Sequence, residues 1–194
     1  MTSDPVSDSQ TPAPQTPKPT WRSWVENLQV VAIALVLALL IRTFVAEPRF
    51  IPSDSMVPTL LVGDRLIIEK VSYRFHPPQA GDIVVFDPPP QLQERGYARD
   101  QAFIKRIIGL PGQIIEVRDR QVWVDQHPLQ EPYVAEAPDY QMPPVKVPPG
   151  SYFVMGDNRN NSNDSHVWGF LPGDNLIGRA CFRFFPLTRL GGIR

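Results

Sequence analysis

The sequence has little cysteine and little histidine. Its 194 residues contain one cysteine, Cys181, and three histidines spaced about forty residues or more apart, namely His76, His127 and His166. A single cysteine excludes an intrachain disulfide and a zinc site built from several thiolates. Histidines so widely spaced form no metal-ligand motif. We therefore expect no metal and no other cofactor.

The chain also has no large excess of charge of one sign. The chain has 20 acidic and 19 basic side chains, its formal net charge is −1, and no basic run is longer than a dipeptide. Binding to a nucleic-acid backbone depends on clustered lysine and arginine. We therefore expect no nucleic-acid partner.

Proline, in contrast, is abundant. The 23 prolines make up about 12% of the chain, roughly twice the usual ~5%. Proline removes a backbone hydrogen-bond donor and breaks the interior of a helix. A bundle of long helices is therefore excluded as the fold of the whole chain.

The first 46 residues divide into a polar tail and an apolar run. Residues 1–20 contain five prolines and no aromatic residue, so they cannot bury enough surface to offset chain entropy, and we expect a disordered tail over residues 1–24. Residues 30–41 carry no polar side chain. A helix over residues 28–46 would be roughly 28 Å long, close to the ~30 Å hydrocarbon core of a bilayer. The run predicts a transmembrane segment over residues 25–46.

Two other interpretations of this run remain open. A cleaved secretory signal needs a small residue three positions before the cut, where Phe44 stands if the cut follows Ala46. A buried core helix needs neighbouring helices that the rest of the chain does not predict. An uncleaved membrane anchor is favoured.

The flanking basic residues are Lys18 and Arg22 before the run and Arg42 and Arg49 after it. Because they are balanced, the charge rule does not decide the orientation.

After residue 46 the sequence changes to short β-branched and aromatic runs separated by proline and glycine turn signals. No fixed period is present, which argues against a propeller or a solenoid. The pattern predicts an all-β domain over residues 47–194. Residues 126–150 contain seven prolines, and we expect an extended, partly irregular excursion there. The predicted strands are residues 65–69, 82–86, 103–110, 113–117, 121–124, 152–155 and 176–185.

One segment places two serines between two prolines. Ser53 and Ser55 lie between Pro52 and Pro58, whose rings restrict the backbone on either side. A stiff loop can present a hydroxyl together with backbone N–H groups, which suits nucleophilic attack beside an oxyanion hole. A simple Ser/Thr turn leading out of the anchor is the alternative.

Lys105 lies inside the predicted strand 103–110. Period-two alternation places it on the same face as Phe103 and Ile107, and places Arg106 on the opposite face. Apolar neighbours disfavour the ammonium form and lower the pKa of a lysine below its ordinary ~10.4, as a general base at neutral pH requires. The alternative is an edge-strand lysine or one whose charge reaches solvent.

A third segment, residues 156–169, is polar or glycine over its first eleven positions. Arg159 stands where a calcium loop has a ligand, so the calcium pattern fails. The segment can be a solvated loop or an ordered loop that supports catalysis. A triad of Ser55, His166 and Asp164 is a further alternative, because triads are recognised by geometry that a sequence does not supply.

Four segments resemble the catalytic-domain motifs of type I signal peptidases, and they follow in that family's order behind an N-terminal apolar run. They are PSDSMVPTL (52–60), GDIVVF (81–86), FIKRIIGLPG (103–112) and GDNRNNSNDSHVWG (156–169). Each motif alone is weak or moderate, whereas four in order are specific, and the resemblance extends from about residue 30 to the C-terminus. It implies a mostly antiparallel, signal-peptidase-like β fold with one N-terminal transmembrane helix, in which residues 113–150 are a reduced form of the family's additional β domain.

The resemblance assigns roles to individual residues. It implies that Ser55 is the nucleophile and Lys105 the general base of a Ser/Lys dyad. Ser53 would supply an oxyanion-hole hydroxyl beside the Ser55 N–H, and Ser162 would hydrogen-bond to the lysine and orient it. The loop-organising residues would be Asp157 and Asp164, each pairing with Arg106 or Arg159. The family-matched pocket walls would be Ile51, Leu60, Val85 and Ile104.

Two positions depart from the best-known form of the family. Asn160 stands where aspartate is frequent, and His166 stands where arginine is frequent. These departures affect the ion pairing expected in the loop and leave the Ser55 and Lys105 assignments unchanged. The loop that ends in HVWG, together with the proline-rich tail, resembles the branch of the family found in photosynthetic membranes.

The resemblance implies a membrane-bound serine endopeptidase that removes N-terminal signal peptides from exported precursors and cuts after small-x-small (Ala-x-Ala-like) sites. Its partners would be the signal peptides of secreted or lumenal precursors and the lipid bilayer, and we expect a monomer. The catalytic domain would lie on the periplasmic, extracytoplasmic or thylakoid lumenal side of a plasma or thylakoid membrane. One alternative is an inactive membrane-anchored binding module of the same fold. Another is a self-cleaving regulator, which would need a DNA-binding module in place of the anchor.

Overall fold

The computed structural model describes residues 21–193 of the chain, so the predicted tail lies outside the described residues up to residue 20. The first described element is helix α1, Trp21–Phe44. It begins within the predicted tail, because residues 21–29 contain neither proline nor glycine to stop it. The part Trp24–Phe44 has a mean hydropathy of 2.2 and no side chain buried within the structure. The helix is therefore long and apolar enough to cross a membrane.

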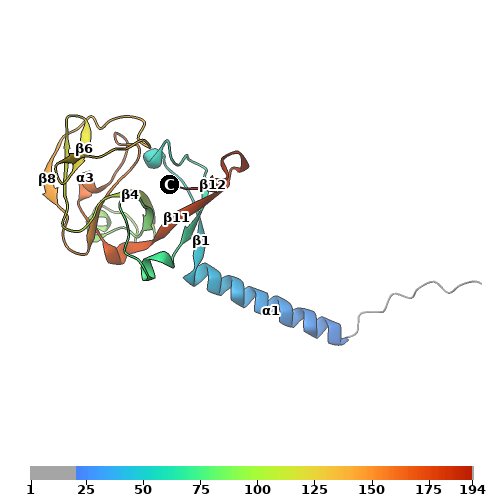
Figure 1. Cartoon of the computed structure of the whole chain (residues 1–194). Coiled ribbons are helices and arrows are strands. Elements are labelled where there is room, and N and C mark those ends of the chain that lie inside the picture. Colours follow the sequence, from blue (N-terminus) through green and yellow to red (C-terminus); the bar gives the residue numbers. More distant parts are fainter. Residues whose placement is uncertain (1–20, 194) are drawn as a thin grey trace, which may run out of the picture. The chain divides into compact units, whose positions relative to one another are not determined.

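The chain separates into two units, one ending at Leu39 and one beginning at Leu40. The second unit contains two β-sheets, and every strand pair in them is antiparallel (Figure 1). The larger sheet has the order β1-β2-β11-β3-β4-β9-β10, with β12 paired to β11, and the smaller has the order β7-β6-β5-β8. The predicted all-β, mostly antiparallel class is confirmed.

The bounds of the elements are as follows. The larger sheet consists of β1 (Ala46–Phe50), β2 (Arg65–Glu69), β3 (Ile83–Phe86), β4 (Phe103–Gly109), β9 (Ser151–Met155), β10 (Leu171–Pro172), β11 (Leu176–Phe185) and β12 (Gly191–Gly192). The smaller sheet consists of β5 (Ile114–Arg118), β6 (Gln121–Val124), β7 (His127–Pro128) and β8 (Met142–Lys146). The short helices are η1 (Asp54–Met56), η2 (Ser72–Arg74), α2 (Pro90–Gln93), α3 (Ser165–Trp168), η3 (Gly173–Asn175) and η4 (Leu187–Arg189).

All seven predicted strands are present, as β2, β3, β4, β5, β6, β9 and β11, with ends that differ by at most one residue. Five further strands, β1, β7, β8, β10 and β12, were not predicted, and prolines hid the two longest of them. β1 contains Pro48, and β8 contains Pro143 and Pro144 within the segment expected to be irregular. Both strands lie at the edge of their sheet, where a missing N–H leaves one side of the ladder intact. Proline therefore signalled an edge strand here rather than a loop.

Strand β3 shows how the large sheet separates two apolar cores. Its residues Ile83 and Val85 belong to one buried cluster, and Val84 and Phe86 belong to another. Because successive strand residues point to opposite faces, both faces of β3 are covered. Val84 lies opposite Lys105 of β4 in the strand register. Lys105 therefore shares the face of the second cluster, which also contains Ile107.

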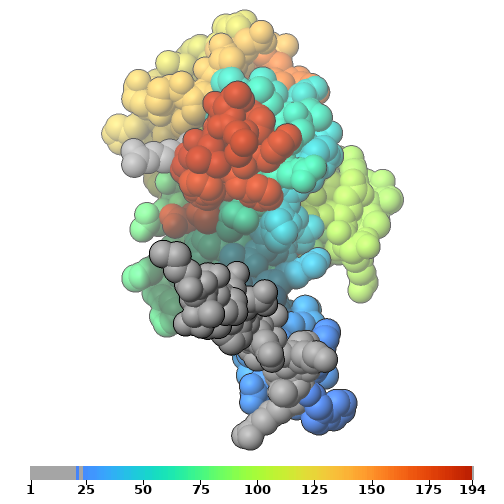
Figure 2. All heavy atoms as spheres, turned by 90° about the vertical axis from the view of Figure 1, so that its right-hand side faces the viewer, coloured from blue at the N-terminus to red at the C-terminus, as the bar shows by residue number. Residues whose placement is uncertain are grey.

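The C-terminal hairpin from β11 to β12 is fastened to the segment that follows η1. Asp64 is buried and accepts hydrogen bonds from Arg183 at 3.3 Å and from Arg189 at 2.9 Å. Both guanidinium groups also donate to the Thr59 carbonyl oxygen. Figure 2 shows this last part of the chain, coloured red, at the surface. The hairpin thus supports from outside the stretch that leads away from Ser55.

Candidate active site

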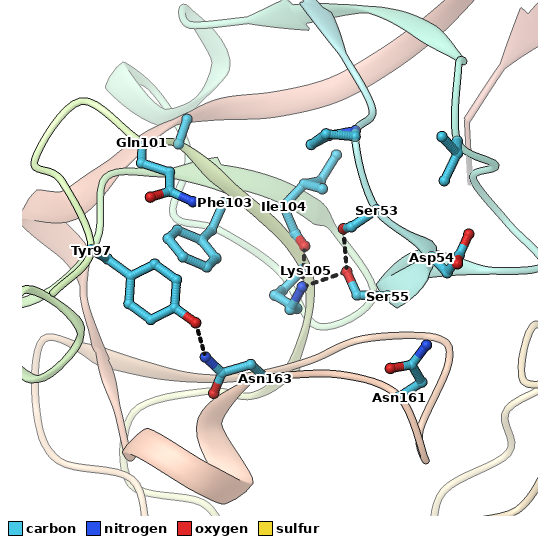
Figure 3. Close-up of a pocket in the computed structure, with 13 residues that line it drawn as sticks. Ser53, Asp54, Ser55, Tyr97, Gln101, Phe103, Ile104, Lys105, Asn161 and Asn163 are labelled. Carbon is cyan, nitrogen blue, oxygen red and sulfur yellow. Dashed lines mark hydrogen bonds between the residues drawn. The ribbon is translucent and has the colours of Figure 1, made fainter. Parts of the chain in front are cut away.

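Ser55 lies in a short turn that the apolar core holds in place. The turn is the 3-10 helix η1, and both its last residue, Met56, and the nearby Leu60 are fully buried. The Leu60 N–H donates to the Met56 carbonyl oxygen at 2.9 Å. Ser55 itself is 9% exposed and lines a cleft (Figure 3).

Lys105 approaches this serine from strand β4. Its Nζ lies 2.7 Å from Ser55 Oγ and 2.9 Å from the Ile104 carbonyl oxygen, and the residue is 3% exposed (Figure 3). Burial lowers the pKa of Lys105 from 10.5 to about 8, while the negative charges of Asp164 and Asp157 act in the opposite direction. A buried amine in contact with a hydroxyl can accept its proton at mildly alkaline pH. The pair can therefore act as a nucleophile and its base.

Asp157 joins the lysine strand to the serine segment. Arg106 Nε donates to Asp157 Oδ1 at 2.8 Å and Arg106 Nη2 donates to Oδ2 at 2.6 Å, with both residues buried. The Thr59 hydroxyl donates to Asp157 Oδ2 at 2.5 Å. The Arg106 guanidinium also lies 3.9 Å from the ring centroid of Tyr133. Arg106 neighbours Lys105 in β4, and Thr59 follows Ser55 in the chain. The Asp157 carboxylate therefore holds the lysine strand and the serine segment together.

Asp164 pairs with a histidine rather than with an arginine. Its Oδ1 accepts from His166 Nδ1 at 2.7 Å and from the His166 N–H at 3.2 Å, and its Oδ2 accepts from the Gly156 N–H at 2.8 Å. The His166 ring stacks on Tyr140, with centroids 4.3 Å apart and planes 15° from parallel. Asp164 is also the N-cap of α3. The Asp164 carboxylate thus fixes the start and the end of the polar loop, residues 156–169.

Among the described residues, the hydrogen-bond partners of Ser55 Oγ are Lys105 at 2.7 Å and Ser53 at 3.5 Å. His166 is instead held by Asp164 and Tyr140. The alternative triad of serine, histidine and aspartate is therefore not assembled.

Arg159 has a partner that the sequence did not indicate. Its guanidinium donates to both carboxylate oxygens of Glu131, at 2.7 and 2.6 Å, and its Nε donates to the Gly156 carbonyl oxygen at 3.0 Å. The expected pairing of Arg159 with Asp157 or Asp164 is therefore wrong. The reason is that the 126–150 excursion returns against the polar loop and brings Glu131 with it, across 28 residues of sequence.

Asn160, one of the two departures from the family pattern, meets the same excursion. Its Oδ1 accepts from the Asp139 N–H at 2.9 Å and its Nδ2 donates to the Ala137 carbonyl oxygen at 3.2 Å. An aspartate could make the first of these bonds but not the second, because an ionised carboxylate has no donor. The amide therefore fits the backbone that it faces.

Ser53 and Ser162 are placed differently from each other. Ser53 is exposed in the cleft. Ser162 Oγ is buried beside Gly156 and has no hydrogen-bond partner within residues 21–193. The predicted bond from Ser162 to Lys105 is thus not formed, and the lysine takes the Ile104 carbonyl as its second acceptor.

The cleft beside Ser55 has a volume of about 530 Å³. Of the predicted wall residues, Ile104 lines it. Ile51, Leu60 and Val85 do not line it and are buried in the core cluster to which Ile104 also belongs. The side chains that do line the cleft, besides Ser55, Lys105 and Ile104, are those of Pro52, Ser53, Asp54, Val62, Tyr97, Gln101, Ala102, Phe103, Asn161 and Asn163.

Sequence reasoning missed Tyr97 and Asn163. The Asn163 amide donates to the Tyr97 hydroxyl at 3.1 Å, and the Tyr97 ring contacts the Phe103 ring edge-on with centroids 5.2 Å apart (Figure 3). Tyr97 belongs to the connection between β3 and β4, in which no motif was recognised. Within the described residues, no group of three or more His, Cys, Asp or Glu side chains is placed to hold a metal ion.

The chain is similar to proteins of known name over most of its length. A family model described as signal peptidase, peptidase S26, matches residues 21–185. The chain is 64% identical over 171 residues to a probable signal peptidase I-1 of Synechocystis sp., covering 88% of this chain and 87% of that protein. It is 51% identical over 193 residues to a signal peptidase I of Leptolyngbya laminosa, covering 95% of each. It is 48% identical over 168 residues to a probable chloroplastic thylakoidal processing peptidase 2 of Arabidopsis thaliana, covering 87% of this chain and 46% of that protein.

Proposed function

The chain belongs to the signal peptidase family, peptidase S26, and is a serine endopeptidase, and on that premise we propose that it removes signal peptides from exported precursors by means of a Ser55/Lys105 dyad. The observation that carries the dyad is the 2.7 Å separation of Lys105 Nζ from Ser55 Oγ, with the lysine buried. An inactive binding module of the same fold would not need this contact. It would also not need a buried lysine, because burying a charged amine costs free energy.

The proposed mechanism follows from these two atoms. Neutral Lys105 takes the hydroxyl proton as Ser55 Oγ attacks the carbonyl carbon of the scissile bond. The Ser55 N–H and the Ser53 hydroxyl stabilise the oxyanion of the tetrahedral intermediate. The protonated lysine then gives its proton to the leaving amine, and an acyl-enzyme remains. Lys105 next takes a proton from water, whose attack releases the signal peptide and restores Ser55.

A free edge of strand β4 supports the proposed substrate geometry. Strand β9 pairs with β4 only from Arg106 onward. Residues 103–105 therefore have β3 on one side and, within the described part of the chain, no strand on the other, where the cleft lies. An extended precursor segment can add there as a strand, so that its first and third residues before the cut point the same way. This alternation supports a small-x-small specificity.

The precursor assay tests this function. Purified full-length protein in detergent should cut a precursor whose signal ends in Ala-x-Ala immediately after the second alanine. Phenylalanine in place of either alanine should slow the cut roughly 10²-fold or more, whereas a large residue between them should change it little. The products are identified by mass spectrometry, with a Ser55→Ala chain as the control. Cleavage that ignores residue size at both alanine positions would contradict the specificity proposed here.

Membrane anchoring by α1 is the second part of the proposal, with the catalytic domain on the extracytoplasmic or lumenal side. Only eight residues, Glu47 to Asp54, separate the apolar run from Ser55, and an extended chain covers at most ~3.6 Å per residue. The nucleophile therefore lies within roughly 30 Å of the end of the run. Anchoring raises the effective concentration of the enzyme at precursors in the same membrane.

We expect a form that begins at Val45 to retain turnover of soluble peptides but to lose at least ~10-fold more on membrane-inserted precursors. Val45 is kept because its carbonyl oxygen accepts from the Lys70 N–H at 2.9 Å. Fusing this form to an unrelated transmembrane segment is the control and should restore precursor cleavage. Equal processing of inserted precursors by the anchored and anchorless forms, at matched concentration, would count against the anchor's role.

A further inference from the structure

The two carboxylates whose charges act on Lys105 are compensated differently. Asp157 is buried against the Arg106 guanidinium, which is permanently charged and donates to both of its oxygens. Asp164 is equally buried, but its side-chain partner is His166, at 2.7 Å. The charge of Asp157 is therefore always neutralised, whereas that of Asp164 is neutralised only by a cationic His166, protonated on both ring nitrogens.

His166 can change its charge without moving Asp164. An imidazole whose Nδ1 is protonated donates to Asp164 Oδ1 in its neutral form and in its cationic form alike. The Tyr140 ring, stacked 4.3 Å away, holds the plane of the imidazole. The His166 side chain is 19% exposed, so it can exchange protons with solvent. The hydrogen bond between His166 and Asp164 is therefore the same for a neutral and for a cationic imidazole.

The other charged groups in this region do not replace His166 as a partner of Asp164. Around Tyr140 lie Arg159, Glu131 and Asp139 in addition to Asp164. Arg159 and Glu131 are paired with each other through two hydrogen bonds. Asp139 lies at the surface.

We propose that His166 is a positioning residue of the catalytic centre that controls how strongly the negative charge of Asp164 acts on Lys105. The proposal rests on the assignment of Lys105 as the general base. A neutral His166 leaves the charge of Asp164 uncompensated, which favours the ammonium form of Lys105. A protonated His166 cancels that charge and favours the neutral amine.

Two substitutions separate the charge states. His166→Arg supplies a permanent cation and His166→Gln a permanently neutral donor. In the full-length chain in detergent, kcat/KM for a soluble peptide rises with pH as Lys105 loses its proton. We expect this rise to lie at higher pH in the glutamine variant than in the arginine variant, by roughly half a pH unit to one unit, with the wild type between them. In an Asp164→Asn background the difference should vanish, because the charge being compensated is gone.

Titration of Lys105 itself gives a readout that does not depend on activity. The chain has only four lysines, Lys18, Lys70, Lys105 and Lys146, so NMR of protein labelled with ¹³C at lysine Cε can follow each one, with Lys105→Met for assignment. The Lys105 signal should titrate at higher pH in His166→Gln than in His166→Arg. Should one variant fail to fold, comparison of the other with the wild type still gives the sign of the shift.

The outcomes are distinguishable. Identical Lys105 titrations in the two variants would overturn the proposal for His166 and leave the dyad untouched. A shift of the NMR titration in the expected direction, without a matching shift of the activity profile, would support the control of Lys105 by His166 and would show that Lys105 is not the base. A shift in the opposite direction would also overturn the proposal.

Discussion

Replacement of Lys105 by methionine is expected to abolish turnover and, at pH 7, to stabilise the fold. Methionine is close to lysine in volume and has no charge to desolvate. The pKa of Lys105 is lowered from 10.5 to about 8 by burial, so below about pH 8 its ammonium is carried at an unfavourable site. The corresponding gain in the free energy of unfolding is on the order of 3 kcal/mol. Turnover should fall on the order of 10³-fold or more.

The pH dependence of the free energy of unfolding gives a separate test of the lysine pKa. Between about pH 8 and 10.5 the unfolded chain binds the lysine proton and the folded chain does not. The free energy of unfolding of the wild type should therefore rise with pH across this window, and that of Lys105→Met should lack the rise. Denaturant unfolding at several pH values measures both curves.

Lys146→Met is the matched control, since this lysine is exposed in β8, and it should change neither turnover nor the pH dependence of stability. Ser55→Ala should be as inactive as Lys105→Met, and the double variant no worse, because the two side chains act as one unit. A folded Lys105→Met protein with near-normal turnover would disprove the dyad.

The second large effect is expected at Gly156, which lies between the polar loop and the nucleophile. Its backbone conformation is open to any residue, but an added Cβ would overlap the Ser55 carbonyl oxygen and the Ser162 hydroxyl. The first of these is backbone and cannot rotate away. Gly156→Ala should therefore push the loop from the nucleophile turn and lower kcat by roughly 10²-fold or more, since displacements of about 1 Å have such effects.

Gly150→Ala is the control for this variant. At Gly150 a Cβ would meet nothing within 4 Å, but the φ of +70° is unfavourable for alanine. That variant should lose about 1 kcal/mol of stability and retain kcat. If Gly156→Ala retained wild-type kcat as well, the close packing of the loop on Ser55 would not matter for catalysis.

The strands were predictable because each depends on neighbours in the sequence. Runs such as 65–69 and 121–124 are rich in β-branched residues and bounded by turn signals, and their ends were predicted to the residue. The face of Lys105 was predictable for the same reason, since alternation along β4 is a local property. The prolines of β1 and β8 misled because proline has the same local effect in a loop and at a sheet edge. Only the order of strands in the sheet shows whether a proline lies in a loop or in an edge strand.

The resemblance gave Arg106 or Arg159 as the partner of Asp157, and Arg106 is the one found, but no local pattern predicts the ion pairs of the site, since they join residues far apart in the chain. Asp157 is 51 residues from Arg106, and Arg159 is 28 residues from Glu131. Nothing in the spacing of Glu131 marks it as a partner of the polar loop. The prediction of the pocket walls failed for a related reason, because an apolar core residue looks the same in sequence whether it is enclosed, as Val85 is, or also lines the cleft, as Ile104 does.

The sequence by itself determined the family, the strand positions and the identities of the serine and the lysine, because motifs and period-two patterns are local. Only the tertiary structure decided the 2.7 Å contact between them, the burial that shifts the lysine pKa, and the pairing of Asp164 with His166. Distance and desolvation depend on how β4, the nucleophile turn and the polar loop pack together. The Ser55–Lys105 contact and the Arg106–Asp157 pair arise only when segments about fifty residues apart are brought together, whereas Asp164 and His166 are two residues apart and the conformation of their loop decides that they pair.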